Sequence, residues 1–255
     1  MKILPALPFV LVALIGCSAP SDGGQAMPDQ LKYNVNASAK VHTELAGLYY
    51  ERVQFGIALG EIELALQADR NYAPAYYMRG LVHMALHEDR EAESDFQQSL
   101  RLDKTDPKAH YNYGWFLCQH GKEKESISYF LAALKNPLYE TPELAYLNAG
   151  RCSKKAGNNK DAEEFLQHAL QIRPGLPQAL LAMAELSFAD GDYTAAKKHF
   201  AKFSEKPDNL TAEQLWLAVR IERKVGDRNA EASYGIQLRR RFPDARETQL
   251  LIHGE

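Results

Sequence analysis

The feature that most constrains the fold of this chain is a repeat of about 34 residues that runs through most of its length. A small residue recurs inside similar aromatic-rich segments: Gly114 follows Gly80 by 34 residues, Gly150 follows after a further 36, and Ala184 after another 34. Self-similarity of this kind is typical of solenoids, in which each unit covers the apolar face of the next. The repeat therefore predicts one elongated domain built from stacked copies of a single unit.

Within each unit the small and large apolar residues follow helical spacing. The first unit carries Ala58, Ile62 and Ala65, an i, i+4, i+7 pattern that recurs in later units and marks one face of an α-helix. Glycine is favoured in the turn before this helix because it readily adopts positive φ. The residues at that turn are His87, Gly121, Gly157, Gly191 and Gly226.

This register resembles that of tetratricopeptide (TPR) repeats, in which a helix A, a turn and a helix B form one unit. No stretch alternates apolar and polar residues as strands do, so the fold class is predicted to be all-α. We predict a right-handed superhelical TPR solenoid over residues 39–255, with a C-terminal capping helix after about residue 244. Its six repeats are expected at about 39–72, 73–106, 107–142, 143–176, 177–211 and 212–246.

The first seventeen residues differ from the rest. Lys2 precedes a charge-free run from Ile3 to Ile15, which is too short to span a bilayer and predicts a signal peptide over residues 1–16. The junction Gly16-Cys17 resembles the lipobox of bacterial lipoproteins, which implies cleavage before Cys17 and acylation of its thiol. The alternative is an ordinary signal peptide that contains a cysteine.

The lipobox resemblance also implies a location. Two or more acyl chains hold a protein firmly on a membrane, and Ser18 in place of aspartate favours the outer membrane of a Gram-negative cell, on its periplasmic face. Residues 17–38 are rich in Ser, Gly, Pro and Asn with little apolar periodicity. They are predicted to form a lipidated flexible tether.

The two remaining cysteines occupy helix A of successive repeats. Cys118 falls at position 12 of the third repeat and Cys152 at position 10 of the fourth. Successive A helices lie side by side in a TPR array, and an oxidising compartment favours pairing. We predict a disulfide between them; two free buried thiols are the alternative, because position 10 can point away from position 12.

Charge and motifs indicate a binding protein without catalytic chemistry. The net charge is −3 and the basic residues are scattered, which argues against nucleic acid as a partner. His83 and His87 have the i, i+4 spacing of a zinc helix, but Met84 stands where a zinc protease has glutamate, so both are predicted to be structural. We expect no enzyme activity, no catalytic residue, no metal, no cofactor and no small-molecule substrate.

Helix A positions 2, 5, 6, 9 and 12 should line the concave face of the solenoid. Aromatic residues at positions 5 and 9 are not needed for TPR packing, and exposed apolar clusters mark interaction sites. Such a surface suits an extended or helical peptide; the alternative is that neighbouring helices cover these side chains. The predicted partner-binding groove consists of Tyr50, Tyr77, Met78, Leu81, Met84, Tyr111, Asn112, Trp115, Leu147, Asn148 and Arg151.

Four stretches go beyond a generic TPR pattern: Asn112–Cys118, Asn136–Pro142, Asn148–Cys152 and Ala232–Arg240. Together with the lipobox and six repeats, they resemble the type IV pilus biogenesis lipoproteins of the PilF/PilW family, the pilotins of the pilus secretin. The most discriminating stretch is Asn136–Pro142, which holds a two-residue insertion in the third repeat.

The resemblance implies a lipid-anchored scaffold of the outer membrane whose protein partner is the pilus secretin subunit. It would help that subunit to reach the outer membrane and to multimerise. The alternative is a TPR lipoprotein adaptor for another envelope machine, such as peptidoglycan enzymes or outer-membrane barrel assembly, which would share every feature except the four stretches.

Overall fold

The computed structural model describes residues 29–205 and 210–254, with side chains from residue 36 onward, so the predicted signal peptide and Cys17 lie outside the described residues. Within these ranges there are thirteen helices and no strand. No helix in the described part of the chain has both the length and the apolar character required to cross a bilayer. The helices are α1 (Asp29–Glu51), α2 (Phe55–Ala68), α3 (Ala73–Ala85), α4 (Asp89–Leu102), α5 (Pro107–Gln119), α6 (Glu123–Ala133), α7 (Pro142–Lys155), α8 (Asn159–Ile172), α9 (Pro177–Ala189), α10 (Tyr193–Ser204), α11 (Ala212–Val225), α12 (Arg228–Arg241) and α13 (Arg246–His253).

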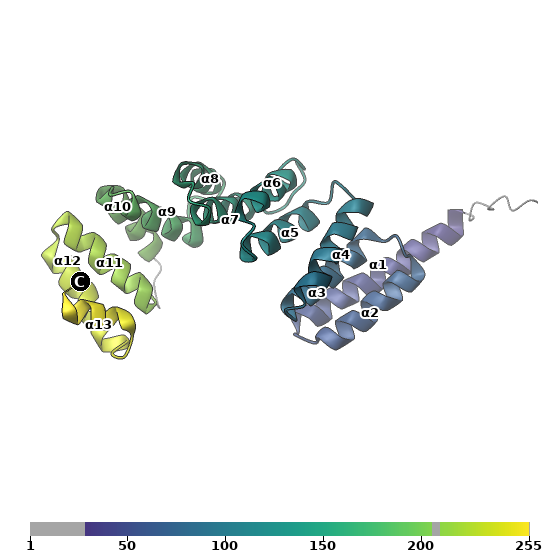
Figure 1. Ribbon diagram of the computed structural model, residues 1–255, viewed down its shortest axis with the longest axis horizontal. Coiled ribbons are helices and arrows are strands. Elements are labelled where there is room, and N and C mark those ends of the chain that lie inside the picture. Colours follow the sequence, from purple (N-terminus) through teal and green to yellow (C-terminus); the bar gives the residue numbers. More distant parts are fainter. Residues whose placement is uncertain (1–28, 206–209, 255) are drawn as a thin grey trace, which may run out of the picture.

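Consecutive helices pack as pairs, from α1 with α2 to α11 with α12, and each pair corresponds to one predicted repeat. The pairs stack into a long curved array with α1 and α2 at one end and α13 at the other (Figure 1). In the middle of the array α6, α8 and α10, which are B helices, lie on the outer side of the arch, while the A helices α5, α7 and α9 lie on its inner side (Figure 1). The predicted all-α TPR solenoid with a C-terminal capping helix is confirmed.

The turn inside each repeat is set by one residue in the left-handed region. His87 and the four predicted glycines all have positive φ, between 60° and 84°. In the first repeat the same register position holds Val53, with a φ of 60°. A β-branched residue is disfavoured there, which is why its role in the turn was not predicted.

Helices A and B of one repeat approach so closely that position 8 of helix A must be small. A Cβ added at Gly150 would lie 2.8 Å from Leu166 Cγ and 3.1 Å from the carbonyl oxygen of Ala162. Leu166 and Ala162 are both fully buried, so neither can move into solvent. Interiors at this packing density do not absorb an extra methyl group without strain.

The substitution Gly150→Ala should therefore destabilise the protein by about 1–3 kcal/mol. The matched control is Gly60→Ala in α2, where a Cβ would meet nothing within 4 Å. There alanine should stabilise by about 0.5–1 kcal/mol, because it restricts the unfolded chain and favours the helix. Urea unfolding of both variants measures the difference, and a stabilising effect at both sites would contradict the close approach described above.

The predicted tether is wrong in its C-terminal part, since α1 begins at Asp29 and residues 29–38 are helical. After Pro28 the sequence contains no glycine or proline until Gly47, so nothing interrupts a helix that continues from the first repeat. Ala39 is fully buried near the middle of this helix. The low apolar content of the segment was therefore a poor guide to its structure.

Candidate protein-interaction face

The inner side of the array is built from A helices, and two predicted groove residues share one cavity there. Trp115 of α5 and Arg151 of α7 line a cavity of about 420 Å³ that also includes Lys154 and, from α9, Glu185. Trp115 is half-buried and Arg151 is exposed. Together they present an aromatic surface beside a positive charge, which a peptide with apolar and acidic side chains would complement.

A disulfide between Cys118 and Cys152 forms one wall of this cavity. The two Cα atoms are 6.0 Å apart and both side chains are buried, so the bond ties α5 to α7 inside the solenoid. The Lys155 Nζ atom donates a hydrogen bond of 3.1 Å to the carbonyl oxygen of Cys118 and lies 3.6 Å from a carboxylate oxygen of Glu123. These contacts cross-link the third and fourth repeats at the edge of the cavity.

A repeated tyrosine–asparagine contact connects successive A helices. The Asn112 side-chain amide donates to the Tyr77 hydroxyl at 3.2 Å, and the Asn148 amide donates to the Tyr111 hydroxyl at 2.7 Å. Each pair joins position 5 of one repeat to position 6 of the next. Burial raises the pKa of both Tyr77 and Tyr111, so these hydroxyls remain neutral. The pairs hold the spacing of neighbouring repeats.

Three predicted groove residues belong to the interior instead. Met78, Leu147 and Asn148 are 6%, 4% and 7% exposed, so the prediction that they line an open surface is wrong. Met78 is directed at the preceding A helix, where its sulfur lies 3.9 Å from the Cβ position of Gly47. Leu147 joins the buried cluster that contains Leu166. In these repeats position 6 of helix A, and position 5 in the fourth repeat, thus face a neighbouring helix and not the predicted groove.

Most of the remaining predicted residues are half-buried, because they pack against the cores of adjacent repeats while keeping part of their surface accessible. They form a mainly apolar lining, and among them Trp115 lies at the cavity of about 420 Å³ described above. The half-buried set is Tyr50, Tyr77, Leu81, Met84, Tyr111, Asn112 and Trp115.

The insertion in the third repeat adds a tyrosine to this lining. The connection from α6 to α7 places the Tyr139 ring next to the Tyr111 ring, with 6.3 Å between the ring centres. Burial raises the pKa of Tyr139 to about 12. The adjacent Leu138 is 85% exposed, and its backbone N–H donates to the Asn136 side chain at 2.9 Å. Sequence reasoning singled out this stretch but did not place Tyr139 beside the A helices.

A second cavity of about 510 Å³ continues the inner side toward the C-terminus, and sequence reasoning missed it. Its walls include Phe188 of α9 with Trp216 and Arg220 of α11. The Arg220 guanidinium carbon lies 4.6 Å from the Phe188 ring centre and 5.9 Å from that of Trp216. The Arg220 Nε atom is buried without a hydrogen-bond partner, and burial lowers the pKa of this side chain.

The two cavities meet at a shared ion pair. Lys154 Nζ lies 2.8 Å from a carboxylate oxygen of Glu185, and both residues line both cavities. A continuous groove therefore runs along the A helices from Trp115 to Arg220; we call it the A-helix groove. Phe188, Trp216 and Arg220 occupy positions 12, 5 and 9 of their repeats, so the register rule applied to the last two repeats would have found them.

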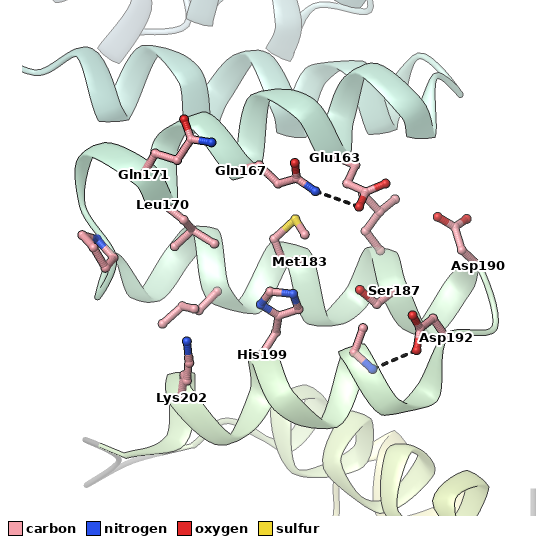
Figure 2. Close-up of a pocket in the computed structure, with 14 residues that line it drawn as sticks. Glu163, Gln167, Leu170, Gln171, Met183, Ser187, Asp190, Asp192, His199 and Lys202 are labelled. Atoms are coloured by element: carbon pink, nitrogen blue, oxygen red, sulfur yellow. Dashed lines mark hydrogen bonds between the residues drawn. The ribbon is translucent and has the colours of Figure 1, made fainter.

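Another hollow of about 510 Å³ lies on the B-helix side, between α8 and α10 (Figure 2). Figure 2 shows His199 and Lys202 from α10 facing Glu163 and Gln167 of α8, with Met183 of α9 between them. The Gln167 amide donates to Glu163 at 2.9 Å, and burial lowers the pKa of His199. The lining is a mixture of polar and aliphatic side chains and lacks the aromatic–cation arrangement of the A-helix groove.

Neither side of the array gathers the side chains of a metal centre. In residues 29–205 and 210–254, no three histidine, cysteine, aspartate or glutamate side chains lie close enough to hold an ion. His83 makes a contact of 2.5 Å with Glu88 and one of 3.6 Å with Asp95, while His87 occupies the turn. These two histidines serve the packing and the turn of the second repeat.

Comparison with known proteins agrees with this architecture. Residues 73–106 and 154–215 match tetratricopeptide repeat families. Over 250 residues the chain is 26% identical to the type IV pilus assembly protein PilF of Pseudomonas aeruginosa, and the match covers 98% of both proteins. The structure of P. aeruginosa PilF superimposes with a TM-score of 0.81 at 24% identity, over 87% of this chain and all of that one.

The crystal structure of PilW, a type IV pilus biogenesis factor, is 32% identical, with a TM-score of 0.76 over 84% of this chain and 98% of that one. Likeness at this level of identity extends along both proteins and is not confined to single repeats. The chain therefore belongs to the type IV pilus biogenesis family of TPR proteins that includes PilW and PilF.

Proposed function

We propose that this protein is an outer-membrane lipoprotein that helps the pilus secretin subunit to reach the outer membrane and to multimerise there. Family membership supports the role in pilus biogenesis, and Gly16-Cys17 supports the acyl anchor. The observation that carries the proposal is the A-helix groove, which offers one continuous binding surface from Trp115 to Arg220.

The groove selects a partner segment by its chemistry. Trp115 and Phe188 provide flat apolar surface, while Arg151 and Arg220 provide positive charge next to it. Among the described residues the buried Nε of Arg220 has no hydrogen-bond partner, and buried polar groups of this kind are expected to find one. The groove also carries carboxylates, Glu213 and Glu247, at its C-terminal end. We therefore assign it to a segment of the secretin subunit with apolar side chains, acidic ones opposite Arg151 and Arg220, and a basic one opposite the two glutamates.

Rigidity of the groove favours this binding mode. The disulfide between Cys118 and Cys152 ties α5 to α7 at the N-terminal end of the groove, and the two tyrosine–asparagine pairs hold α3, α5 and α7 in register there. A binding surface that is already in its bound conformation loses less entropy when the partner docks. The scaffold thus contributes affinity through residues that do not touch the partner.

Truncation of the groove aromatic tests the proposal. We expect Trp115→Ala to weaken binding of the purified secretin subunit by roughly tenfold or more, because buried tryptophans dominate interface energies. Isothermal titration calorimetry measures the affinity, and thermal unfolding of the same samples measures stability.

The matched control is Tyr146→Ala, which removes a half-buried aromatic on the α8 side of α7, where Tyr146 stacks on His168 at 5.1 Å. It should lower stability as much as Trp115→Ala does while leaving the affinity unchanged. Equal binding by the Trp115 variant, or equal loss with both variants, would contradict docking in the A-helix groove. Capture of peptidoglycan enzymes or barrel-assembly proteins in place of the secretin would favour the adaptor role.

A further inference from the structure

The two ends of the solenoid differ in how their apolar surface is covered. At the C-terminal end α13 packs on α11 and α12 and contributes Leu250 and Leu251 to the core. No described helix covers the first repeat on the side away from the second. Four aliphatic side chains are 43–53% exposed on that repeat, and we call them the end face: Val41, Leu48, Ile57 and Leu64.

The α1 half of the end face occupies positions that later repeats bury. Val41 and Leu48 each precede their register counterparts, Ala75 and Val82, by 34 residues. Ala75 and Val82 are fully buried because the first repeat packs on them. Val41 and Leu48 therefore lie where a preceding repeat would contact the solenoid. Both are apolar although no described helix covers them.

The α2 half of the end face is not explained by TPR packing. At the register position of Ile57 the second to fourth repeats carry Glu91, Glu125 and Asp161 and the last two carry alanine; at that of Leu64 the second repeat carries Gln98. The solenoid accepts polar residues at these positions, so it does not require aliphatic ones. Ile57 and Leu64 therefore point to a contact outside the solenoid.

Both halves belong to one surface of the α1–α2 hairpin. Ile57 and Leu64 are seven residues apart on one side of α2, and Glu61 lies between them on the same side. The His42 Nδ1 atom of α1, next to Val41, is 2.7 Å from a Glu61 carboxylate oxygen. This contact shows that α1 and α2 meet between the two pairs of aliphatic residues, beside Val41 on one helix and between Ile57 and Leu64 on the other.

The turn of the same hairpin adds a fifth apolar side chain. Val53 is 70% exposed and has a φ of 60°, a conformation that disfavours a β-branched residue. The other repeats place glycine or histidine at this position. The chain thus has an exposed valine where glycine would relieve the backbone, as expected for a side chain with a role outside the fold.

We infer that the end face docks on the lipid surface of the membrane that holds the acyl chains of Cys17; the inference rests on the proposed lipidation. Residues 18–28 span at most about 40 Å when fully extended, so the first repeat is always within reach of the bilayer. Because the linker between the acyl anchor and the first repeat is short, the end face has a high effective concentration at the membrane surface. Five aliphatic side chains can enter the headgroup boundary without matching any particular shape.

Other occupants fit the end face less well. Residues 18–28 contain only one large apolar residue, Met27, so this segment could not cover the face. A stable dimer of ordinary size uses about 20–30 residues on each side, far more than this patch offers. Beside Val41, Lys40 and Glu44 lie 3.8 Å apart as an exposed ion pair, and this balanced charge suits zwitterionic headgroups.

The test measures how the non-acylated protein, with residue 18 as its first residue, partitions onto vesicles of phosphatidylethanolamine with a minority of phosphatidylglycerol. We expect a measurable fraction of the unsubstituted chain to bind the vesicles, weakly and reversibly, at high lipid concentration. The double variant Ile57→Glu/Leu64→Gln copies the residues of the second repeat, so it should fold normally and yet partition roughly tenfold less. The control Ile236→Glu/Ile252→Gln removes aliphatic side chains that are 57% and 59% exposed in the C-terminal repeats and should partition like the unsubstituted chain.

A second variant separates binding from folding. Val53→Gly should raise the melting temperature, because glycine relieves the left-handed turn, and should lower vesicle partitioning. The inference is overturned if the unsubstituted chain does not partition, if both double variants partition alike, or if the end-face variant changes only the oligomeric state. Since the assay contains neither acyl chains nor secretin, its failure leaves the tests of the proposed function unaffected.

Discussion

Replacing both Cys118 and Cys152 by alanine should lower the free energy of unfolding by about 3–4 kcal/mol. The disulfide closes a loop with a sequence separation of 34 residues, and chain entropy assigns about that stabilisation to a loop of this length. Both side chains are buried between α5 and α7. Their loss should therefore loosen the joint between the third and fourth repeats, next to the cavity that holds Trp115.

Urea unfolding under non-reducing conditions measures this effect. Addition of dithiothreitol should bring the unsubstituted protein close to the stability of the double variant and leave the variant unchanged. Ser153→Ala is the matched control: its hydroxyl is buried beside Cys152 without a partner, so its removal should cost nothing. Equal stability of the double variant and the unsubstituted protein without reductant would show that the thiols are not paired.

Replacing Cys17 by serine should move the whole population of the protein from the outer-membrane fraction to the soluble periplasm. Serine cannot form the thioether, and the acyl chains of the proposed anchor would supply most of the membrane affinity, at about 0.8 kcal/mol for each buried methylene. The variant should carry an ordinary secretory leader, so that an uncleaved signal peptide does not hold it in the membrane. Sucrose-gradient fractionation and immunoblotting measure the distribution.

The control for this experiment is Ser18→Asp with Cys17 intact. The lipoprotein resemblance implies that it keeps the acyl chains and changes only their sorting, so the protein should appear in the inner-membrane fraction. If the Cys17 variant still fractionates with the outer membrane, another element anchors the protein. The end face alone should not suffice, because a few aliphatic side chains bind a bilayer only weakly and reversibly.

The register of the repeats was predictable because each position has one packing role. Gly150 must be small where helix A meets Leu166, and Gly157 must reverse the chain at positive φ. The pairing of Cys118 with Cys152 followed from the same register, since positions 12 and 10 of adjacent A helices face each other. Repetition supplies several independent copies of every constraint, which a single globular domain does not.

The details of the groove were less predictable, because exposure depends on the neighbour and not only on the position. Met78 is buried by the preceding helix, whereas Trp115 at position 9 keeps access to solvent. Tyr139 reaches Tyr111 through a connection whose path no periodic pattern specifies. Exposure in the first repeat differs from that in the later ones, because no described helix precedes it. Positions that later repeats bury against the preceding repeat are therefore exposed there.

The most direct test of the account is the state of the pilus secretin in cells that lack this protein. Heat-stable secretin multimers in the outer-membrane fraction should disappear, together with twitching motility, and the unsubstituted chain should restore both. Complementation with Trp115→Ala should restore neither, while Tyr146→Ala should restore both. Unchanged amounts of multimers in the deletion strain would contradict the proposed role in secretin assembly.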